Sequence, residues 1–461
     1  MKLPALELND LPAPKLGRTL LARHVAMISI GGIIGAGLFV GSSAAILSAG
    51  PAIIVSYALA GVLVLLVMRM LGEMALLLPG VSAFTEFSRI GLGEWAGFTS
   101  GWLYWYFWIV VVAIEAIAGA NMIRQWIDMP IWLVGWILLA VMTGTNLLST
   151  RSYGEVEFWF ASLKVAAIVA FITVAGAYVL GITSGHGPDF SNLTAHGGFM
   201  PMGAMSVLAG VTTVIFSLTG AEIATIAAAE SPEPARTIAK LTNTVILRII
   251  LFYVGSIFLI VSIVPWDEIV SGRSPFVAAM EAINVPAAAP IMNVIVLTAV
   301  LSCLNSGLYV TSRVLFTLAS RGDAPQSIVA VNSRQVPARA ILLGSAFGYL
   351  AIMASVLSPE LVFAFLVNAS GAIMLVIYLL VAAAQLRIRR EAERTAPERL
   401  TFKVWLFPYS TYLTIGGIAA VLIAMAFSGA HAAEFYASAL LCLLVVAAYR
   451  IFRWKRDGQK I

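Results

Sequence analysis

The sequence has 461 residues, of which 60% are hydrophobic and only 11% are charged, and its net charge at pH 7 is +5. Soluble domains are about a quarter charged, so this composition excludes a soluble protein and predicts one integral-membrane domain. The polar, basic residues 1–22 lack the apolar core and cleavage site of a secretory signal, so no cleavable signal is expected.

The fold class expected is an all-α integral membrane protein, because apolar segments of about 20 residues recur along the whole chain. Twelve spanning helices are predicted, at residues 23–47, 51–78, 95–123, 130–148, 157–181, 202–229, 241–264, 289–319, 338–357, 360–386, 405–427 and 432–452. A cytoplasmic tail of residues 1–22 precedes this single membrane domain (23–452), and a second tail, 453–461, follows it.

The lysines and arginines predict the orientation, since cytoplasmic loops are enriched in them. With the N-terminus in the cytoplasm, 21 of the 28 basic residues fall on the cytoplasmic side and only Arg124 and Arg273 fall outside. Both termini are therefore expected in the cytoplasm. Topology accounts for the positive charge, and no nucleic-acid partner is expected.

The first predicted span contains five glycines in "SIGGIIGAGLFVGS" (29–42). Two interpretations compete. Gly31–Gly35 and Gly37–Gly41 have the small-xxx-small spacing that lets another helix pack closely. Alternatively, the helix is interrupted, so that its backbone can bind a ligand.

A second interruption is predicted in the sixth span, where Ser217, Thr219 and Gly220 of "FSLTGAE" precede Glu222. Five helices separate the two positions, which is typical of an inverted repeat with discontinuous helices 1 and 6. The repeats are expected at 23–181 and 202–386, with two extra helices over 405–452. The amino end of a half-helix attracts a carboxylate, and its carboxyl end offers carbonyls to an ammonium.

The parts of the chain between spans are assigned by polarity. Residues 265–286 are amphipathic and too charged to cross, so this segment is expected on the outer surface. The loop at 182–201 holds His186 and His196, and a histidine pair in such a loop is more often exposed to solvent than a ligand.

Four ionisable residues inside predicted spans are candidate functional residues, because charge in the bilayer is costly. Glu73 lies one turn from Arg69, and an ion pair within the helix is a sufficient structural account. Glu115 lies in the middle of its span, has no partner nearby in sequence, and is therefore expected to face a cavity.

Lys164 and Glu222 each leave two interpretations open. Lys164 either extends to the cytoplasmic surface or is an internal cation whose protonation depends on its surroundings. Glu222 follows the second interruption and either couples protonation to that geometry or forms a structural hydrogen bond.

Two further clusters are candidates for the pocket. In "GWLYWYFW" (101–108), Trp102 and Trp105 fit an interfacial belt, whereas Tyr104 and Trp108 share one helix face and fit a gate. In span eight, a mid-helix polar cluster either lines the cavity or bonds helices together, and its members are Cys303, Asn305 and Ser306.

Enzyme and metal chemistry are not expected. The chain has only two cysteines, Cys303 and Cys442, both in apolar runs, and no metal-ligand spacing. It has no zinc-binding His/Glu motif, no paired intramembrane aspartates and no Ser/His dyad. A channel is disfavoured because filter-like repeats and rings of charge are missing. A membrane sensor that does not transport stays open.

Several motifs in chain order resemble the amino acid transporter branch of the amino acid–polyamine–organocation superfamily. They are "RHVAMISIGGIIGAGLFVGS", "LGEM", "GWLYWYFW", "GEVEFWFASLKV", "GAEIATIAAAESPEPA", "NSGLYVTSRVLFTLASRGDAP" and "VWLFPYSTYL". Within this branch, the sequence motif "TIAAAES" and the aromatic run most resemble those of bacterial 4-aminobutyrate (GABA) permeases. The resemblance implies the fold above, proton symport by alternating access, and GABA or another amino acid as substrate. No cofactor is implied, and the partners expected are substrate, proton and lipid, in a monomer or weak oligomer.

The resemblance also implies residue roles. The first interruption, at Ile33, Gly35, Ala36 and Gly37, would hold the substrate carboxylate. The second would receive the amino group on its backbone carbonyls, at Phe216, Ser217, Leu218 and Thr219. Lys164 resembles a lysine that replaces a sodium ion in proton-coupled members, Glu222 a gating acid, and Cys303 a cysteine near the pathway.

The length of the pocket is not predicted by any residue. In GABA three carbons separate the two charges, whereas in an α-amino acid one carbon does. If Glu115 lines the pocket with Tyr104, it can meet a distant ammonium, which favours GABA or a basic amino acid.

Overall fold

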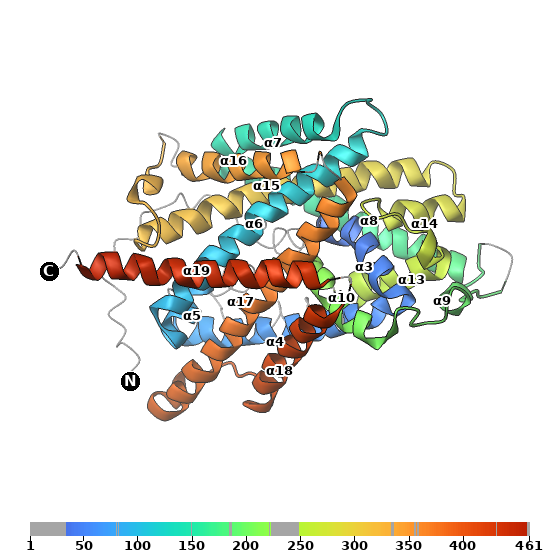
Figure 1. Cartoon of the computed structure of the whole chain (residues 1–461). Helices are drawn as coiled ribbons and strands as arrows, with labels where there is room; N and C mark the ends of the chain where they lie inside the picture. Colours follow the sequence, from blue (N-terminus) through green and yellow to red (C-terminus); the bar gives the residue numbers. More distant parts are fainter. Residues whose placement is uncertain are drawn as a thin grey trace.

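The computed structural model of the chain describes residues 34–79, 81, 83–148, 150–183, 187–220, 222, 249–332, 336–354, 356, 359–429 and 431–458. Within these residues, every regular element is a helix and there is no strand. The helices pack into one bundle, and many of them run along its long direction (Figure 1). In lipid a helix is favoured because it satisfies its own backbone hydrogen bonds.

The helices of the first half are α2 (Ala36–Phe39), α3 (Gly41–Ala49), η2 (Gly50–Ala52), α4 (Ile53–Leu77), α5 (Thr85–Leu92), α6 (Glu94–Ile123), α7 (Ile131–Leu148), α8 (Thr150–Val179), α9 (Asn192–Ala195) and α10 (Gly203–Leu218). Those of the second half are η3 (Ile249–Gly255), α13 (Ser256–Ile263), η4 (Trp266–Glu268), α14 (Pro275–Ile283), α15 (Ala288–Ser320), η5 (Gln326–Val329), α16 (Ala338–Ala354), α17 (Pro359–Thr395), η6 (Pro397–Arg399), α18 (Tyr409–Phe427) and α19 (Ala432–Gly458).

Eight helices in the described part of the chain are long and apolar enough to cross a membrane. This confirms the all-helical, multi-pass membrane class. Three shorter apolar helical segments, α10, η3 with α13, and α16, fall within the predicted spans 202–229, 241–264 and 338–357. The first predicted span, 23–47, begins outside the described residues.

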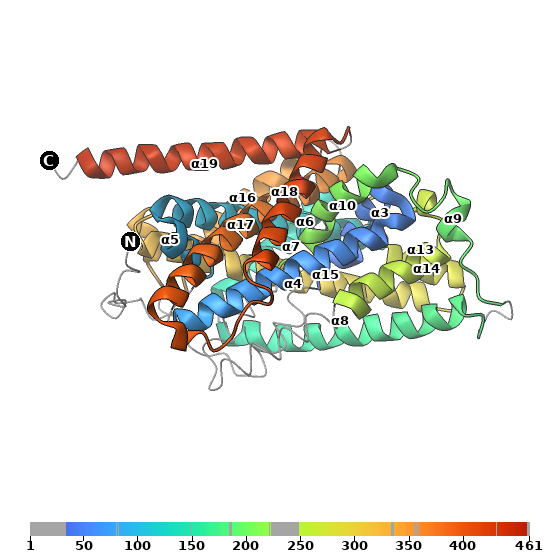
Figure 2. The same cartoon turned by 90° about the horizontal axis from the view of Figure 1, so that it is seen from below.

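The core lies around α6, which packs against α5, α7, α15 and α17. In its most apolar stretch 83% of the residues are buried, whereas in α19 only 11% are. Figure 2 shows α19 and α8 at opposite edges of the bundle. The large apolar side chains that α19 exposes, such as Leu440 and Leu443, are those expected to face lipid tails.

The segment 265–286, expected on the outer surface, packs one side of its helix against the rest of the protein. Its helix α14 packs against α8, α13 and α15. Phe276 is fully buried, with its ring centroid 4.9 Å from that of Phe39 and 4.7 Å from that of Phe171. Its apolar side is therefore covered by protein, and its place on the outer surface stays a prediction.

Glu73 does not form the predicted ion pair with Arg69. It lies fully buried and pairs with Arg389 of α17, while the Arg69 guanidinium donates to the Lys403 carbonyl at 2.8 Å and stacks on Trp405. The structural interpretation of Glu73 survives, but its partner comes from a distant helix that periodicity within one helix does not reveal.

Candidate functional site

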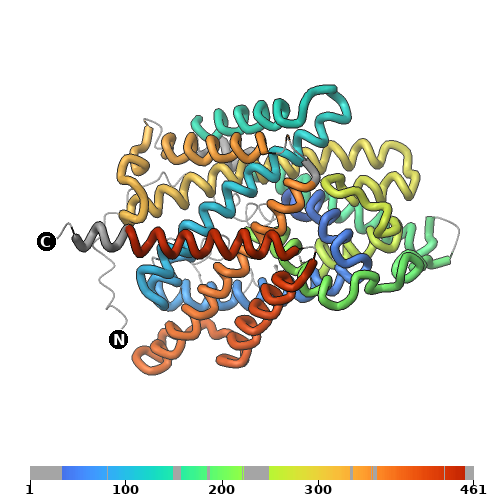
Figure 3. The backbone as a smooth tube through the Cα atoms, in the orientation of Figure 1, coloured from blue at the N-terminus to red at the C-terminus, as the bar shows by residue number. Residues whose placement is uncertain are grey.

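Two helix ends meet in the middle of the bundle, at the two positions where interruptions are predicted. Gly35 is extended, and α2 begins at Ala36, within the predicted span 23–47. Helix α10 ends at Leu218, within the span 202–229, and Thr219 is extended. Figure 3 shows the blue segment that contains α2 and α3 beside the green α10, and these elements are in contact.

The glycines at the start of α2 support the close-packing interpretation of "SIGGIIGAGLFVGS". A Cβ atom on Gly37 would lie 2.7 Å from the Cα atom of Ser217, so this glycine allows the two helix ends to touch. A Cβ atom on Gly35 would lie 2.6 Å from the Cys303 sulfur. Close packing at these glycines is therefore confirmed, whereas the interruption of the helix stays a prediction, because the residues before Ile34 lie outside the described part of the chain.

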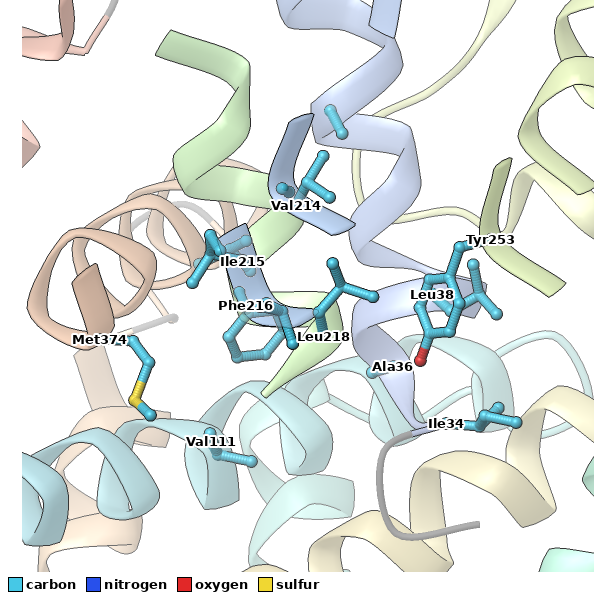
Figure 4. Packing of buried hydrophobic residues seen from close by; sticks show 14 of the residues in the cluster. Ile34, Ala36, Leu38, Val111, Val214, Ile215, Phe216, Leu218, Tyr253 and Met374 are labelled. Carbon is cyan, nitrogen blue, oxygen red and sulfur yellow. The ribbon is translucent and has the colours of Figure 1, made fainter. Parts of the chain in front are cut away.

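A small cavity of about 20 Å³ lies between these ends. It has room for about one water molecule and is far below the roughly 300–1,000 Å³ of typical ligand pockets. It is lined by Gly35, Gly37, Phe107, Trp108, Val111, Glu115, Phe216, Ser217, Thr219 and Cys303. Figure 4 shows Ala36 and Leu38 of α2 near Phe216 and Leu218 of α10, with Val111 of α6 close by. Ala36 and Leu218 are buried beside the cavity but do not line it, and Ile33 lies outside the described residues.

Glu115 faces the cavity, as expected, and is bound to the start of α2. The Ala36 N–H donates to both of its carboxylate oxygens, at 3.1 and 3.2 Å. The Cys303 thiol donates to the same carboxylate. The amide predicted to hold a substrate carboxylate thus already holds a carboxylate of the protein.

The end of α10 is also bonded to its surroundings. The Ser217 hydroxyl donates to the Gly37 carbonyl at 2.6 Å, and the Tyr253 hydroxyl donates to the Ser217 carbonyl at 3.1 Å. The Thr219 hydroxyl donates back to Ile215 at 2.8 Å. The carbonyl of Ser217, expected to accept an ammonium, is therefore also held by a tyrosine that sequence reasoning did not find.

Glu222 lies fully buried behind the end of α10. It accepts hydrogen bonds from the Gly220 N–H at 2.9 Å, from Tyr104 at 3.0 Å and from Tyr378 at 3.4 Å. Tyr104 thus binds this acid and does not line the cavity, whereas Trp108 does, with its ring 6.1 Å from that of Tyr104. Of the two residues expected to form a gate, Tyr104 therefore forms a hydrogen bond with Glu222, and only Trp108 lines the cavity.

Lys164 is an internal cation, because its side chain is completely buried. The alternative, in which it extends to the cytoplasmic surface, is wrong. Its ammonium donates to the Ser302 hydroxyl at 2.8 Å and lies 3.7 Å from a carboxylate oxygen of Glu157. Ser302 is the neighbour of Cys303 in α15, so Lys164 reaches the wall of the cavity from behind.

Sequence reasoning missed Glu157, Ser302, Tyr253 and Tyr378. Glu157 alone carried a usable signal: it is seven residues before Lys164, which places both side chains on one face of a helix two turns apart. The other three reach the site from helices distant in sequence, and only the fold brings them there.

Several predicted residues lie away from the cavity. Trp105 is buried against α15 and does not form the expected lipid-facing belt. Asn305 accepts from Asn146 at 2.7 Å, which favours its role in bonding helices together. His196 is one-third exposed and lies beside Asp267, and His186 is outside the described residues.

A charged cluster lies just after the C-terminal end of α15. Arg89 of α5 pairs there with Glu86, Glu94 and Asp323. Burial raises the pKa of the Asp323 carboxyl above its ordinary value, although the neighbouring Arg89 lowers it. These contacts join α5 to the segment after α15 and do not reach the cavity.

Comparison with known proteins shows matches along nearly the whole chain. Residues 24–460 match the family described as amino acid permease. The chain is 50% identical to the gamma-aminobutyric acid permease of Bacillus subtilis, with 96% of this chain and 95% of that protein covered. It is 46% identical to a probable GABA permease of Pseudomonas aeruginosa, with 92% and 90% covered. For the gamma-aminobutyric acid permease of Escherichia coli the identity is 42%, with 96% of each chain covered.

Proposed function

The chain belongs to the amino acid permease family, and from this premise we propose that it imports GABA across the bacterial inner membrane by proton symport. The observation that carries the proposal is the similarity to GABA permeases over more than nine-tenths of the chain. We assign the substrate to the cavity between the ends of α2 and α10, which must widen to admit it.

The proposed architecture has twelve spans in a 5+5 inverted repeat, with α18 and α19 as the two extra helices and both termini in the cytoplasm. The meeting of α2 and α10 supports it, because paired helix ends at the centre of the membrane form the substrate site in such transporters. Alternating access then requires the first two helices of each repeat to rock against the remaining ones.

The substrate carboxylate is assigned to the backbone N–H groups of Ile33, Gly35, Ala36 and Gly37, and the amino group to the carbonyls of Phe216–Thr219. GABA carries its two charges far apart. When the substrate carboxylate takes the Ala36 N–H, Glu115 is released and can join these carbonyls in receiving the distant ammonium. Glu115 thereby favours a substrate longer than an α-amino acid.

Lys164 and Glu222 are assigned to proton coupling and gating. Lys164 is buried next to Cys303, behind the cavity, and its charge interacts with Glu115. Glu222 joins the end of α10 to Tyr104 of α6, so its hydrogen bonds must change if α10 moves relative to α6.

The test is transport by purified protein in lipid vesicles with an imposed pH gradient. Labelled GABA, aromatic amino acids, proline and basic amino acids are compared. Accumulation of GABA that disappears when the gradient is dissipated supports the proposal. If only a different amino acid accumulates, the substrate is reassigned. If GABA uptake does not depend on the pH gradient, proton symport is wrong. If no amino acid is taken up, a sensor is favoured.

Two variants test the assignments. In Glu115→Gln we expect selectivity to shift away from GABA, and unchanged selectivity and affinity would contradict its role. In Lys164→Ala we expect GABA accumulation against a gradient to be lost, and surviving accumulation would remove this lysine from coupling.

A further inference from the structure

We propose that Glu157 is the inward proton-transfer partner of Lys164, with the Ser302 hydroxyl as the relay between them. The inference deepens the proposed proton symport and rests on it. It adds a second carboxylate and a relay to a step that Lys164 would otherwise perform alone.

The three side chains form a continuous hydrogen-bonded path. The Lys164 ammonium donates to the Ser302 oxygen at 2.8 Å, and the Ser302 hydroxyl donates to Glu157 Oε2 at 2.6 Å. The direct distance from Lys164 Nζ to Glu157 Oε1 is 3.7 Å, which is too long for a hydrogen bond. All three side chains are fully buried. The hydroxyl is the shortest connection, and it can accept one proton while it releases another.

The transfer keeps the buried charge balanced. A Lys164 N–H bond breaks and the proton binds Ser302 Oγ, while the original Ser302 O–H bond breaks and its proton binds Glu157 Oε2. The ion pair becomes a neutral amine and a neutral carboxylic acid, and the relay is unchanged after its hydroxyl reorients. Since an isolated charge in a low-dielectric interior is costly, a step that creates none is favoured over release of a lone proton.

The Ser306 hydroxyl of α15 is a second hydrogen-bond partner of Glu157 beside Ser302. Helix α8 packs against α7, α13, α14, α15 and η3. From α15, Cys303 faces the pair, and Glu115 of α6 interacts electrostatically with Lys164. Among the described residues, α7 and α13 carry no titratable side chain. Glu281 of α14 is paired with Arg273, and Tyr253 of η3 donates to Ser217.

Position along α8 gives the path a direction. Glu157 is seven residues nearer to the start of the helix than Lys164, or about 10 Å along its axis. In the proposed orientation this end faces the cytoplasm. Glu115 and Cys303 connect Lys164 to the cavity on the other side, so Glu157 lies on the path by which a proton leaves.

The experiment uses the full-length protein in vesicles and compares wild type, Glu157→Gln, Glu157→Asp and Ser302→Ala. Thr298→Val is the matched control, because it removes a hydroxyl from α15 one turn away that bonds only to Ile295 of the same helix. Three quantities are measured: GABA exchange at equal pH on both sides, GABA accumulation driven by a pH gradient, and proton entry reported by a trapped dye.

We expect Glu157→Gln to retain exchange but to lose driven accumulation and substrate-dependent proton entry. Ser302→Ala should slow driven uptake by about ten-fold or more, as expected for loss of a proton-transfer group. Glu157→Asp should recover part of the driven uptake and shift its pH profile, and Thr298→Val should behave like wild type.

Other outcomes separate this inference from the proposed function. If wild type shows no proton-driven GABA uptake, the proposed symport fails first. If wild type is driven and Glu157→Gln still accumulates GABA with its proton entry intact, the role of Glu157 is wrong. If Glu157→Gln is not folded, Ser302→Ala decides, and driven uptake equal to that of Thr298→Val overturns the relay.

Discussion

Two fully buried carboxylates in the described part of the chain are each paired with a cation, and they differ in how tightly they are held. Glu73 of α4 accepts from Arg389, from the Gln385 side chain at 2.8 Å and from the Val404 N–H at 2.7 Å. Glu157 of α8 faces Lys164 across 3.7 Å and is joined to it through a serine hydroxyl. Both carboxylates are completely shielded from solvent.

The cation explains the difference. An arginine guanidinium does not release its proton in proteins, so the first pair is a permanent ion pair that fixes α4 to α17 and to the segment before α18. A lysine amine can become neutral when its surroundings favour it. The second pair has an alternative state of the same net charge, and this property suits it to proton transfer.

The largest effect is expected for Glu73→Gln. The substitution leaves Arg389 charged and without its buried carboxylate partner, and breaking such a pair costs about 3–5 kcal/mol of the free energy of unfolding. The measurement is reversible denaturation of the purified protein in detergent micelles.

The control for this prediction is Glu393→Gln, which removes the second carboxylate of Arg389 from a site that is 45% exposed. A surface pair contributes about 0–1 kcal/mol, so this variant should stay near wild type. Equal losses in the two variants would show that burial does not set the strength of the first pair.

A smaller loss of stability is expected for Glu157→Gln. The lysine left behind can shed its proton, so the cost falls from that of an unpaired charge to that of unmatched hydrogen bonds, about 1–3 kcal/mol. The same denaturation measurement, run beside Glu73→Gln, compares the two pairs directly. A loss as large as that of Glu73→Gln would mean that Lys164 stays charged and that the second pair is as fixed as the first.

The sequence predicts the helical membrane class and the positions of both helix ends, because these depend on local patterns. Apolar runs mark the spans, and clustered glycine, serine and threonine mark the ends near Ala36 and Leu218. The same local reasoning identified Lys164, Glu115 and Glu222, since any charge within an apolar run is conspicuous.

The partners of these residues were not predictable in the same way. Arg389 lies 316 positions from Glu73, and Ser302 lies 138 positions from Lys164. Only the packing of helices brings such residues together, and a serine or tyrosine in an apolar helix gives no sign of which carboxylate it will reach. Trp105 was wrongly predicted to face the membrane interface, because a tryptophan at a span end has the same sequence pattern whether lipid or protein covers it.

The smallest loss of stability is expected for Thr411→Val. Thr411 does not contact Glu73 itself but hydrogen-bonds to Gln385, which does. The Thr411 hydroxyl of α18 donates to Gln385 at 2.9 Å, and Gln385 in turn donates to Glu73. Loss of one buried hydrogen bond costs about 0.5–1.5 kcal/mol, because Glu73 keeps Arg389 and the Val404 N–H.

Thr414→Val is the matched change on the same helix, since the Thr414 hydroxyl bonds only to the Ser410 carbonyl one turn earlier. Denaturation in detergent should place Thr414→Val near wild type and Thr411→Val between wild type and Glu73→Gln. If Thr411→Val matches Glu73→Gln, Gln385 rather than Arg389 holds the carboxylate. The tightness of the first pair would then come from its amide neighbour and not from the permanent charge of arginine.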